Sequence, residues 1–509
     1  MSEKYRIFNN ALFNTASWVF TVILSFVFLP YIVRTLGTEG YGLLVLVLSV
    51  IGYFAVLDLN LGDAVIKYVA EYHAENDMKK VNEVVGSVLL AYLVLGTVAG
   101  VAILLFSGTM VNRLLQIKTA LQPAALFAFQ IGSAGILLTM LMSALSAIPN
   151  ALNRYDVTSK ATMAMGLLTN LATVSLLYFG FGLREIVILN LLVSLLGIGF
   201  YALASKRLLP GLELHPVMNF SAIRRILKYG MFSTLSRLSS MMQFQGVRLL
   251  AGIVLGVSAV TFYVVPFSLV SRAMAITFRL AAVIFPVISG MQGQRDFQAV
   301  SKLYLKSSRL IFSVSTAICL PLFLFGGRFL SLWMGETFRQ QTGLVMLLLT
   351  ASLYMDSCTN VPSHVLNGLG MPKFCGYFST FNAVINLLLV YPLSKWLGIN
   401  GIALSFLVGH IIVAPTFVIF VTRKLKLPLM TLLKEVYLMP IIAGMLAAIP
   451  FLILMKAVQG MATLLFVMMA ASALYLVICY VTGVFSQEEK EYIIGYLRLG
   501  KKGSATNVV

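Results

Sequence analysis

Four arginines lie inside long apolar stretches of the sequence, where a charged side chain is unusual. Arg237 and Arg248 are 11 residues apart, and Arg272 and Arg279 are 7 apart. At about 100° per residue, the members of each pair fall on one face of a helix. A charged residue in an apolar helix usually faces a cavity or a partner, and guanidinium binds phosphate through two parallel hydrogen bonds. We therefore expect the four arginines to line a cavity that takes an anionic group such as phosphate or pyrophosphate.

A structural role is the alternative for some of these arginines. A guanidinium near the end of a membrane span can reach the headgroup region, and one in the interior can pair with an acid. Arg248 lies close to the predicted outer end of its span, so both interpretations stay open for it. Arg34 and Lys67, which lie beyond the first spans, complete the set of candidate substrate-binding residues.

Two acids, Asp58 and Asp356, lie within the apolar stretches. A buried carboxylate can carry a proton or another coupling ion, or it can merely neutralise an arginine. His364 and His410 are lone histidines in the sequence and are interpreted as satisfied core histidines. The sequence contains no C-x-x-C pair, no H-E-x-x-H, no G-x-S-x-G and no glycine-rich phosphate loop. It therefore predicts no metal site, no cofactor and no enzymatic activity.

The composition places these residues in a membrane protein. Of the 509 residues, 59% are hydrophobic and only 11% are charged, whereas soluble chains carry roughly a quarter charged residues. This excludes a soluble domain, a disordered chain, a coiled coil and a disulfide scaffold. The apolar runs are continuous rather than alternating, which excludes a β-barrel. The net charge of +19 indicates cytoplasmic loops rather than a nucleic-acid partner, because no basic patch is interleaved with aromatic residues outside the spans.

We expect an all-α polytopic fold with about fourteen transmembrane helices. The predicted spans are 10–34, 41–62, 84–106, 123–149, 159–181, 184–205, 229–251, 259–288, 305–326, 341–367, 374–394, 401–422, 435–455 and 461–484. The first apolar run continues into Arg34 without a small-residue cleavage site, so it is interpreted as an uncleaved helix. With the N-terminus inside, the inner segments hold 25 Lys and Arg and the outer segments hold 8. This asymmetry places both termini in the cytoplasm.

Three pairs of similar segments suggest an internal duplication. Leu36-Gly37 and Leu255-Gly256 are offset by 219 residues, Phe181-Gly182 and Leu397-Gly398 by 216, and Pro149 and Pro362 by 213. The alternative is that Leu-Gly before a helix is a frequent turn. A duplication predicts an N-lobe over 1–205, a C-lobe over 206–425, two added helices over 426–485 and a cytoplasmic tail over 486–509. Two six-helix lobes would then be related by a pseudo-two-fold axis along the membrane normal, with a central cavity.

The segment 63–85 is amphipathic and mixed in charge, which predicts a helix on the cytoplasmic membrane surface. It belongs to a run that carries a family resemblance. The sequence resembles the polysaccharide biosynthesis proteins in four segments. They are LPYIVRTLG, the EGYG turn, LDLNLGDAVIKYVAEY and the proline-asparagine turn of IPNALNRY. These proteins are Wzx-type oligosaccharide flippases of the multidrug/oligosaccharidyl-lipid/polysaccharide (MOP) exporter superfamily.

This resemblance implies a flippase of the bacterial plasma (inner) membrane. Its substrate would be a polyprenyl (undecaprenyl)-pyrophosphate-linked oligosaccharide for O-antigen, capsule or exopolysaccharide assembly. Membrane lipids, and the polysaccharide polymerase and export machinery, would be its partners. Alternating access driven by an ion gradient would be its mechanism.

Three other functions compete with this prediction. A drug/cation antiporter of the same superfamily would need carboxylates in its cavity, but the first span has none. A membrane glycosyltransferase would need a large acidic loop, and the longest outer loop, 107–122, has no Asp or Glu. The flippase for the lipid-linked peptidoglycan precursor shares the pyrophosphate chemistry, so the sequence separates it poorly.

Overall fold

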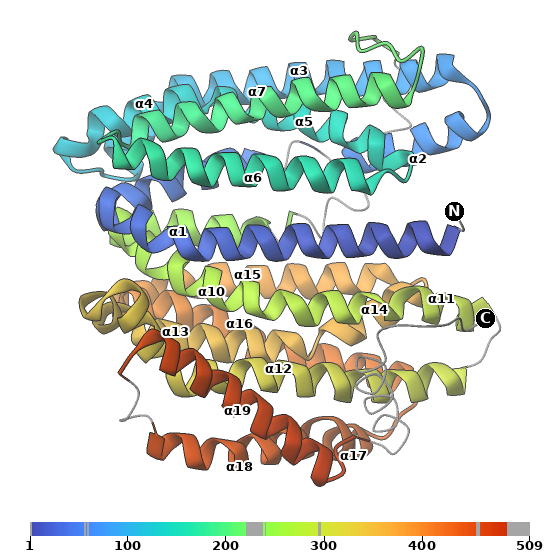
Figure 1. The fold of residues 1–509 in the computed structure, drawn as a ribbon, viewed down its shortest axis with the longest axis vertical. Helices are drawn as coiled ribbons and strands as arrows, with labels where there is room; N and C mark the ends of the chain where they lie inside the picture. Colours follow the sequence, from blue (N-terminus) through green and yellow to red (C-terminus); the bar gives the residue numbers. More distant parts are fainter. Residues whose placement is uncertain are drawn as a thin grey trace. The chain divides into compact units, whose positions relative to one another are not determined.

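The computed structural model describes residues 3–54, 58, 61–219, 238–239, 241–293, 297–454 and 459–485. These ranges contain helices and connections but no strand, so the all-α prediction is confirmed (Figure 1). Within them, 12 segments are long and apolar enough to cross a membrane, and a shorter apolar helix covers Met242–Leu255. The chain is therefore a multi-pass membrane protein.

The observed helices follow the predicted spans. Two predicted spans, 10–34 and 41–62, lie mainly in α1 (Glu3–Phe54), which Gly37 divides with a non-helical φ of 73° and ψ of 167°. The described part of the second span within α1 ends at Phe54, and residues 55–57 and 59–60 lie outside the described residues. The predicted span 229–251 lies partly outside the described residues, and its described end forms η4 (Met242–Gly246) and α9 (Val247–Leu255).

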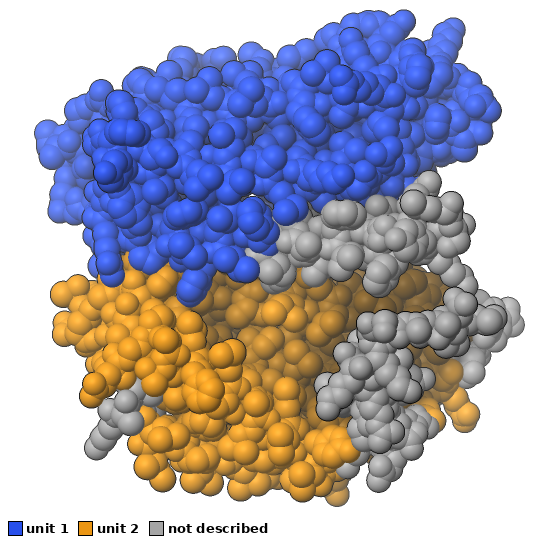
Figure 2. Space-filling model, viewed as in Figure 1, with its two compact units in different colours: residues 1–265, 383–402 blue, residues 266–382, 403–509 orange. Residues whose placement is uncertain are grey.

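The chain forms two compact units, which Figure 2 shows in different colours. Unit 1 comprises residues 1–265 and 383–402, and unit 2 comprises residues 266–382 and 403–509. The predicted lobes, with boundaries after residues 205 and 425, stay a prediction. The predicted tail, 486–509, lies outside the described residues.

Unit 1 is built around α5. In addition to α1, η4 and α9, the unit contains α2 (Leu61–Ala74), α3 (Met78–Thr109), η2 (Met110–Leu114), η3 (Thr119–Leu121), α4 (Gln122–Gly132), α5 (Ala134–Ala151), α6 (Tyr155–Tyr178) and α7 (Leu183–Leu208). Helix α5 packs against α2, α3 and α7, and α1 packs against α6. The buried residues of α5 include Gly135, Ala144 and Ala147. Small side chains allow apolar helices to approach closely.

The surface helix predicted over 63–85 was wrong in its extent. Helix α2 ends at Ala74, Asn76 adopts a left-handed φ of 59°, and α3 begins at Met78. Asp77 caps α3 by accepting a hydrogen bond from the backbone N–H of Lys80 at 3.0 Å, and this bond lowers the pKa of Asp77. The helix α2 is amphipathic as expected, but its apolar face packs on α3 and α5.

Unit 2 is built around α12 (Phe297–Met334). Its other elements are most of α10 (Val257–Ala282), α11 (Ile284–Gly293), α13 (Glu336–Ser357), α14 (Asn360–Gly368), the first part of α15 (Pro372–Leu397), most of α16 (Ile399–Lys424), α17 (Leu429–Leu432), η5 (Leu433–Leu438), α18 (Met439–Leu454) and α19 (Met461–Val481). Helix α12 contacts α13, α18 and α19, and 67% of its most apolar stretch is buried. The last two helices thus belong to the core of this unit.

Glycines at the proposed repeat positions share a backbone conformation. Gly37 has φ 73° and ψ 167°, and Gly256 has φ 87° and ψ 172°. The second pairing needs a correction. Gly398 has a φ of 59°, but Gly182 has a φ of −131°, so the matching left-handed glycine is Gly180 with a φ of 82°. This change brings the second offset to 218, next to the 219 of the first pair.

Candidate functional site

Arg248 lies on α9, two turns before the left-handed Gly256 that ends the helix. Its Nη1 donates to Gln245 Oε1 at 3.1 Å. Its Nε is buried and has no hydrogen-bond partner among the described residues. A buried guanidinium with an unused donor is costly, since such groups are normally paired or bound to an anion. The Nε of Arg248 can therefore donate a hydrogen bond to a further acceptor.

Gln245 holds the Arg248 guanidinium against α1. A Cβ placed on Gly52 would lie 2.9 Å from the amide nitrogen of Gln245, so the glycine leaves the space that this side chain occupies. The aromatic residues Tyr41 and Tyr263 lie close enough to Arg248 to act on its charge electrostatically. The side chain is thus fixed within unit 1 by a polar and aromatic setting.

Arg272 and Arg279 lie on α10, two turns apart, and both side chains are half-buried. Seven residues correspond to a rise of about 10 Å along one helix face. Both arginines belong to unit 2, whereas Arg248 belongs to unit 1. Arg237 lies outside the described residues. The common cationic wall of these four residues stays a prediction.

The two outlying basic candidates are exposed. Arg34 lies on α1, one turn before Gly37. Lys67 lies on α2, with its Nζ 4.6 Å from the ring centroid of Tyr68. A cation over an aromatic face is stabilised modestly at an exposed site. Their role in binding a substrate also stays a prediction.

Asp58 is buried in unit 1, with 4% of its surface exposed. The hydroxyl of Tyr92 on α3 donates a hydrogen bond to its Oδ1. A Cβ on Gly62 would lie 3.1 Å from Ser143 Oγ and 4.0 Å from the Tyr92 hydroxyl, so the polar cluster depends on close approach of α2 to α5. Asp58 therefore ties the start of α2 to α3.

Asp356 pairs with a histidine in unit 2. Its Oδ1 lies 3.4 Å from Nε2 of His410, which is 3% exposed. The Nδ1 of His410 lies 2.9 Å from the Phe406 carbonyl oxygen and 3.0 Å from Ser352 Oγ. Asn382 Nδ2 lies 3.2 Å from Nε2. The interpretation of His410 as a satisfied core histidine is confirmed, because helices α13, α15 and α16 supply it with polar partners.

The polar cluster lies at a break in a membrane-spanning segment. Helix α13 ends at Ser357 and α14 begins at Asn360, with Asp356 in the last turn of α13. Thr359 Oγ1 donates to the Asp356 carbonyl oxygen at 2.8 Å, and Asn360 donates to Thr277 Oγ1 of α10 at 3.2 Å. Discontinuous membrane helices commonly carry substrate and ion sites, because their ends offer unused backbone groups. The residues of the break itself, 357–360, include neither Pro nor Gly.

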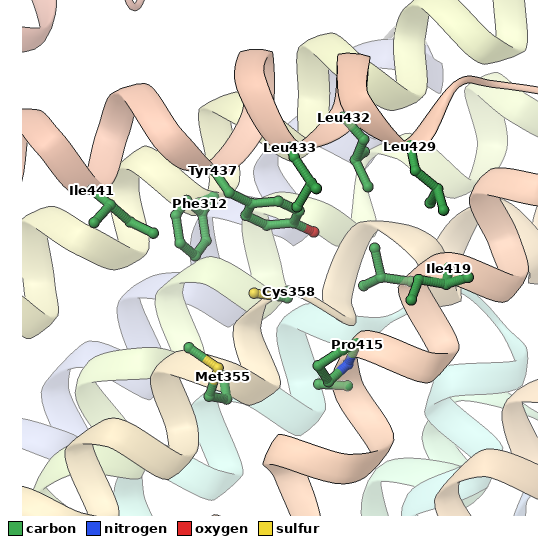
Figure 3. A pocket seen from close by; sticks show the side chains of 12 residues that line it. Phe312, Met355, Cys358, Pro415, Ile419, Leu429, Leu432, Leu433, Tyr437 and Ile441 are labelled. Atoms are coloured by element: carbon green, nitrogen blue, oxygen red, sulfur yellow. The ribbon is translucent and has the colours of Figure 1, made fainter.

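An apolar hollow of about 250 Å³ lies within unit 2, beside the same break (Figure 3). Met355 of α13 and Cys358, in the break after α13, face Tyr437 of η5 across it. The lining residues are Phe312, Met355, Cys358, Ala414, Pro415, Val418, Ile419, Leu429, Leu432, Leu433, Tyr437 and Ile441. This hollow is distinct from the predicted central cavity, which stays a prediction.

In the described ranges, no group of three or more His, Cys, Asp or Glu side chains is placed to hold a metal ion. The four cysteines are free thiols.

Two sequence relatives and two solved structures resemble this chain. The EpsK membrane protein of Bacillus subtilis (strain 168) is 26% identical over 96% of this chain and 97% of its own length. A putative O-antigen transporter of Shigella flexneri is 22% identical over 79% of this chain and 94% of its own. The lipid II flippase MurJ, in an inward closed conformation, has a TM-score of 0.73 at 13% identity, covering 92% of this chain and 98% of its own.

A multidrug-resistance transporter of the MATE family in the MOP superfamily, inward-facing, has a TM-score of 0.68 at 17% identity, covering 82% of this chain and 94% of its own. At these identities, both structures show the fold alone. The family model described as polysaccharide biosynthesis protein matches residues 7–292, which is more than half of the sequence. The chain therefore belongs to the polysaccharide biosynthesis protein family.

Proposed function

We propose that this protein is a flippase for polyprenyl-pyrophosphate-linked oligosaccharides in the bacterial plasma membrane. It moves the lipid-linked glycan from the inner to the outer leaflet by alternating access, and the product feeds O-antigen, capsule or exopolysaccharide assembly. Family membership, the putative O-antigen transporter among its relatives and the fold it shares with a lipid II flippase support this proposal. Polysaccharide polymerase and export proteins are its proposed partners.

The observation that carries the proposal is the guanidinium of Arg248 within an apolar helix, with a buried Nε that no described atom accepts from. Leaving such a donor unpaired costs about 1–3 kcal/mol, which a bound anion would remove. Pyrophosphate offers the oxygens that a guanidinium binds best. We assign the same role to Arg237, Arg272 and Arg279, with Arg34 and Lys67 attracting the headgroup at the ends of the path.

The chemistry disfavours a drug/cation antiporter. The fold alone does not exclude an antiporter, since a multidrug transporter is a structural neighbour. A cationic drug, however, would meet arginines on α9 and α10. Asp58, which could attract it, is already bonded to Tyr92, and Asp356 lies 3.4 Å from His410 Nε2. Like charges in a low-dielectric cavity repel strongly.

The peptidoglycan precursor flippase is the second candidate function, because the lipid II flippase fold fits over 92% of the chain. Complementation separates the two. We expect the gene to restore surface polysaccharide in a strain that lacks its oligosaccharide flippase, and to leave a strain depleted of its lipid II flippase unable to grow. The opposite result would assign the protein to peptidoglycan synthesis. Rescue of neither strain, with the protein present in the membrane, would contradict the proposal.

A further inference from the structure

The cluster around His410 contains a buried acceptor without a donor. Asn382 is 7% exposed, and its Oδ1 has no hydrogen-bond partner among the described residues. The Nδ2 of the same amide lies 3.2 Å from His410 Nε2. Buried polar atoms are nearly always satisfied, so an orphan oxygen beside a titratable ring indicates that the cluster has a second state. That second state must supply the missing hydrogen.

The contacts of the imidazole define the present state. The carbonyl oxygen of Phe406, 2.9 Å from Nδ1, can only accept a hydrogen bond, so Nδ1 carries a hydrogen. In a neutral ring Nε2 is then the acceptor, which matches the Asn382 amide as donor. Asp356 Oδ1, at 3.4 Å, faces the same nitrogen. The carboxylate therefore points at a lone pair, an arrangement that one added hydrogen at Nε2 would make attractive.

We propose that Asp356 and His410 form a proton-binding site, and that this proton is the coupling ion of the proposed transport cycle. The inference rests on the proposed function for its role in transport. The proton arrives at Asp356, whose side chain is 44% exposed against 4% for His410, and passes to Nε2. Nε2–H then donates to Asp356 Oδ1. The net charge of the pair changes from −1 to 0, and release follows the reverse path through Asp356.

Asn382 responds to the proton. Once Nε2 carries hydrogen, the amide must turn by about 180° to present Oδ1 instead of Nδ2, since the two ends of an amide differ only in hydrogen-bonding sense. A Cβ on Gly409 would lie 2.7 Å from Asn382 Oδ1, so the glycine leaves the space that the amide occupies. The one hydrogen on Nε2 is then shared between Asp356 Oδ1 and the turned Asn382 Oδ1, and it strengthens the contact between α13 and α16. Asp356 is in the last turn of α13, before the break to α14. A stronger contact between Asp356 and His410 would therefore act on α13 at this break.

The surroundings favour a proton over a metal cation. Asp356 of α13 faces the ring, α15 presents the uncharged Asn382, and α16 itself contributes the Phe406 carbonyl. The Cys358 thiol, in the break after α13, lies within electrostatic range of Asp356 and is the other titratable neighbour. Sodium prefers a shell of oxygens, as hard cations do. Here the atom that faces the carboxylate is an imidazole nitrogen.

The direct test is a titration of the imidazoles in the substrate-free full-length protein in detergent, by ¹⁵N NMR of labelled histidine. Only four histidines contribute signals, so His410→Gln assigns the one of interest. We expect a neutral ring with hydrogen on Nδ1 at high pH and protonation of Nε2 on acidification. Asp356→Asn should lower the midpoint by at least one pH unit, about a tenfold loss of proton affinity. His364→Gln is the matched control, because His364 packs on Phe278 rather than on an acid.

A His410 ring that stays neutral while the protein remains folded would overturn the site, and so would an unchanged midpoint in Asp356→Asn. Coupling is tested in proteoliposomes with a fluorescent polyprenyl-pyrophosphate-linked sugar as probe. We expect an imposed pH gradient to speed wild-type flipping several-fold. His410→Gln and Asp356→Asn should flip without responding to the gradient, while His364→Gln responds fully. A full response in both site variants would refute coupling. If the wild type moves no probe, the proposed function fails, and the titration still decides the proton site.

Discussion

Thr261 Oγ1 donates a hydrogen bond to the carbonyl oxygen of Thr38 at 2.6 Å. The reciprocal contact joins Gly42 to Val257, because a Cβ on Gly42 would lie 2.1 Å from the Val257 carbonyl oxygen. Thr38 and Val257 each follow a left-handed glycine, Gly37 or Gly256, and Gly42 and Thr261 each lie five residues after it. The contact is therefore reciprocal, because exchanging the two segments position by position gives the same pair of contacts.

Such reciprocity is the mark of a two-fold interface, in which residue i meets residue j and j meets i. The two segments are separated by the same offset of 219 residues that relates their Leu-Gly pairs. The contact thus supports a duplicated chain whose halves meet at these turns. It also explains why one position carries Gly and its equivalent carries Thr, since one helix approaches through the backbone and the other through a hydroxyl.

Replacement of Gly42 by alanine should destabilise the protein. The new methyl group would collide with the Val257 carbonyl oxygen, and forced repacking typically costs about 1–3 kcal/mol. We expect a lower melting temperature of the purified protein and less of it in the membrane. Gly108→Ala is the control, because nothing lies within 4 Å of its Cβ position. Equal stability of both variants would contradict the close contact.

The sequence predicted the helices well, because a continuous apolar run of about 20 residues matches the thickness of the bilayer core and satisfies its own backbone only as a helix. It also predicted turns at Gly37 and Gly256 from their Leu-Gly pairs, and the structure adds that both glycines are left-handed. The sequence did not predict which residues far apart along the chain contact each other. His410 pairs with Asp356 only because α13 and α16 pack together, and no local pattern reports helix packing. The break between α13 and α14 was not predicted for a related reason, since tertiary contacts such as that of Asn360 with Thr277 stabilise it.

Loss of Arg248 should impair export. Arg248→Ala removes the buried donor from unit 1, and a charge-assisted hydrogen bond contributes about 1.5–3 kcal/mol, so transport should fall by about 10- to 100-fold. Arg248→Lys should rescue only partly, since lysine lacks the planar fork. Surface polysaccharide per molecule of membrane protein is the measurement. Arg339→Ala, which breaks an exposed ion pair with Glu336, is the control and should export normally.

Arg237→Ala and Arg272→Ala test the rest of the cationic path. If these side chains bind pyrophosphate, each variant should lose surface polysaccharide without a drop in protein level, and lysine should restore part of it. Normal export by both alanine variants, or a loss that follows from degraded protein, would make these arginines structural.

Asn82 should hold the segment after α7 onto α3. Its Nδ2 donates to the Gly211 carbonyl oxygen at 3.1 Å, and its Oδ1 accepts from the Glu213 backbone N–H at 3.1 Å. Asn82→Ala loses both bonds, each contributing about 0.5–1.5 kcal/mol. Limited proteolysis should then cut within 209–219 several-fold faster than in the wild type. Asn153→Ala, in the connection before α6, offers a matched asparagine whose loss should leave that rate unchanged.

The membrane orientation can be tested by cysteine labelling. The backbone conformation at each position determines whether a cysteine can be introduced there without strain. Gly256, Gly398 and Lys426 would be natural choices in the connections, but all three have left-handed φ values, where a new cysteine at either glycine would be strained. Lys118 and Lys395 are exposed alternatives on the predicted outside, and Lys79 and Lys373 are exposed on the predicted inside.

In a background without the four native thiols, a membrane-impermeant maleimide should label Lys118→Cys and Lys395→Cys in intact cells. It should reach Lys79→Cys and Lys373→Cys only after permeabilisation. This expectation follows from the excess of Lys and Arg, 25 against 8, in the segments assigned to the cytoplasm. Lys118 and Lys395 are separated by an even number of predicted spans, those from 123–149 to 374–394, so they should share the outer face. Labelling of Lys118→Cys from outside together with protection of Lys395→Cys would mean an odd number of crossings between them. The fourteen-span topology would then be wrong by one helix, and the two termini would lie on opposite sides.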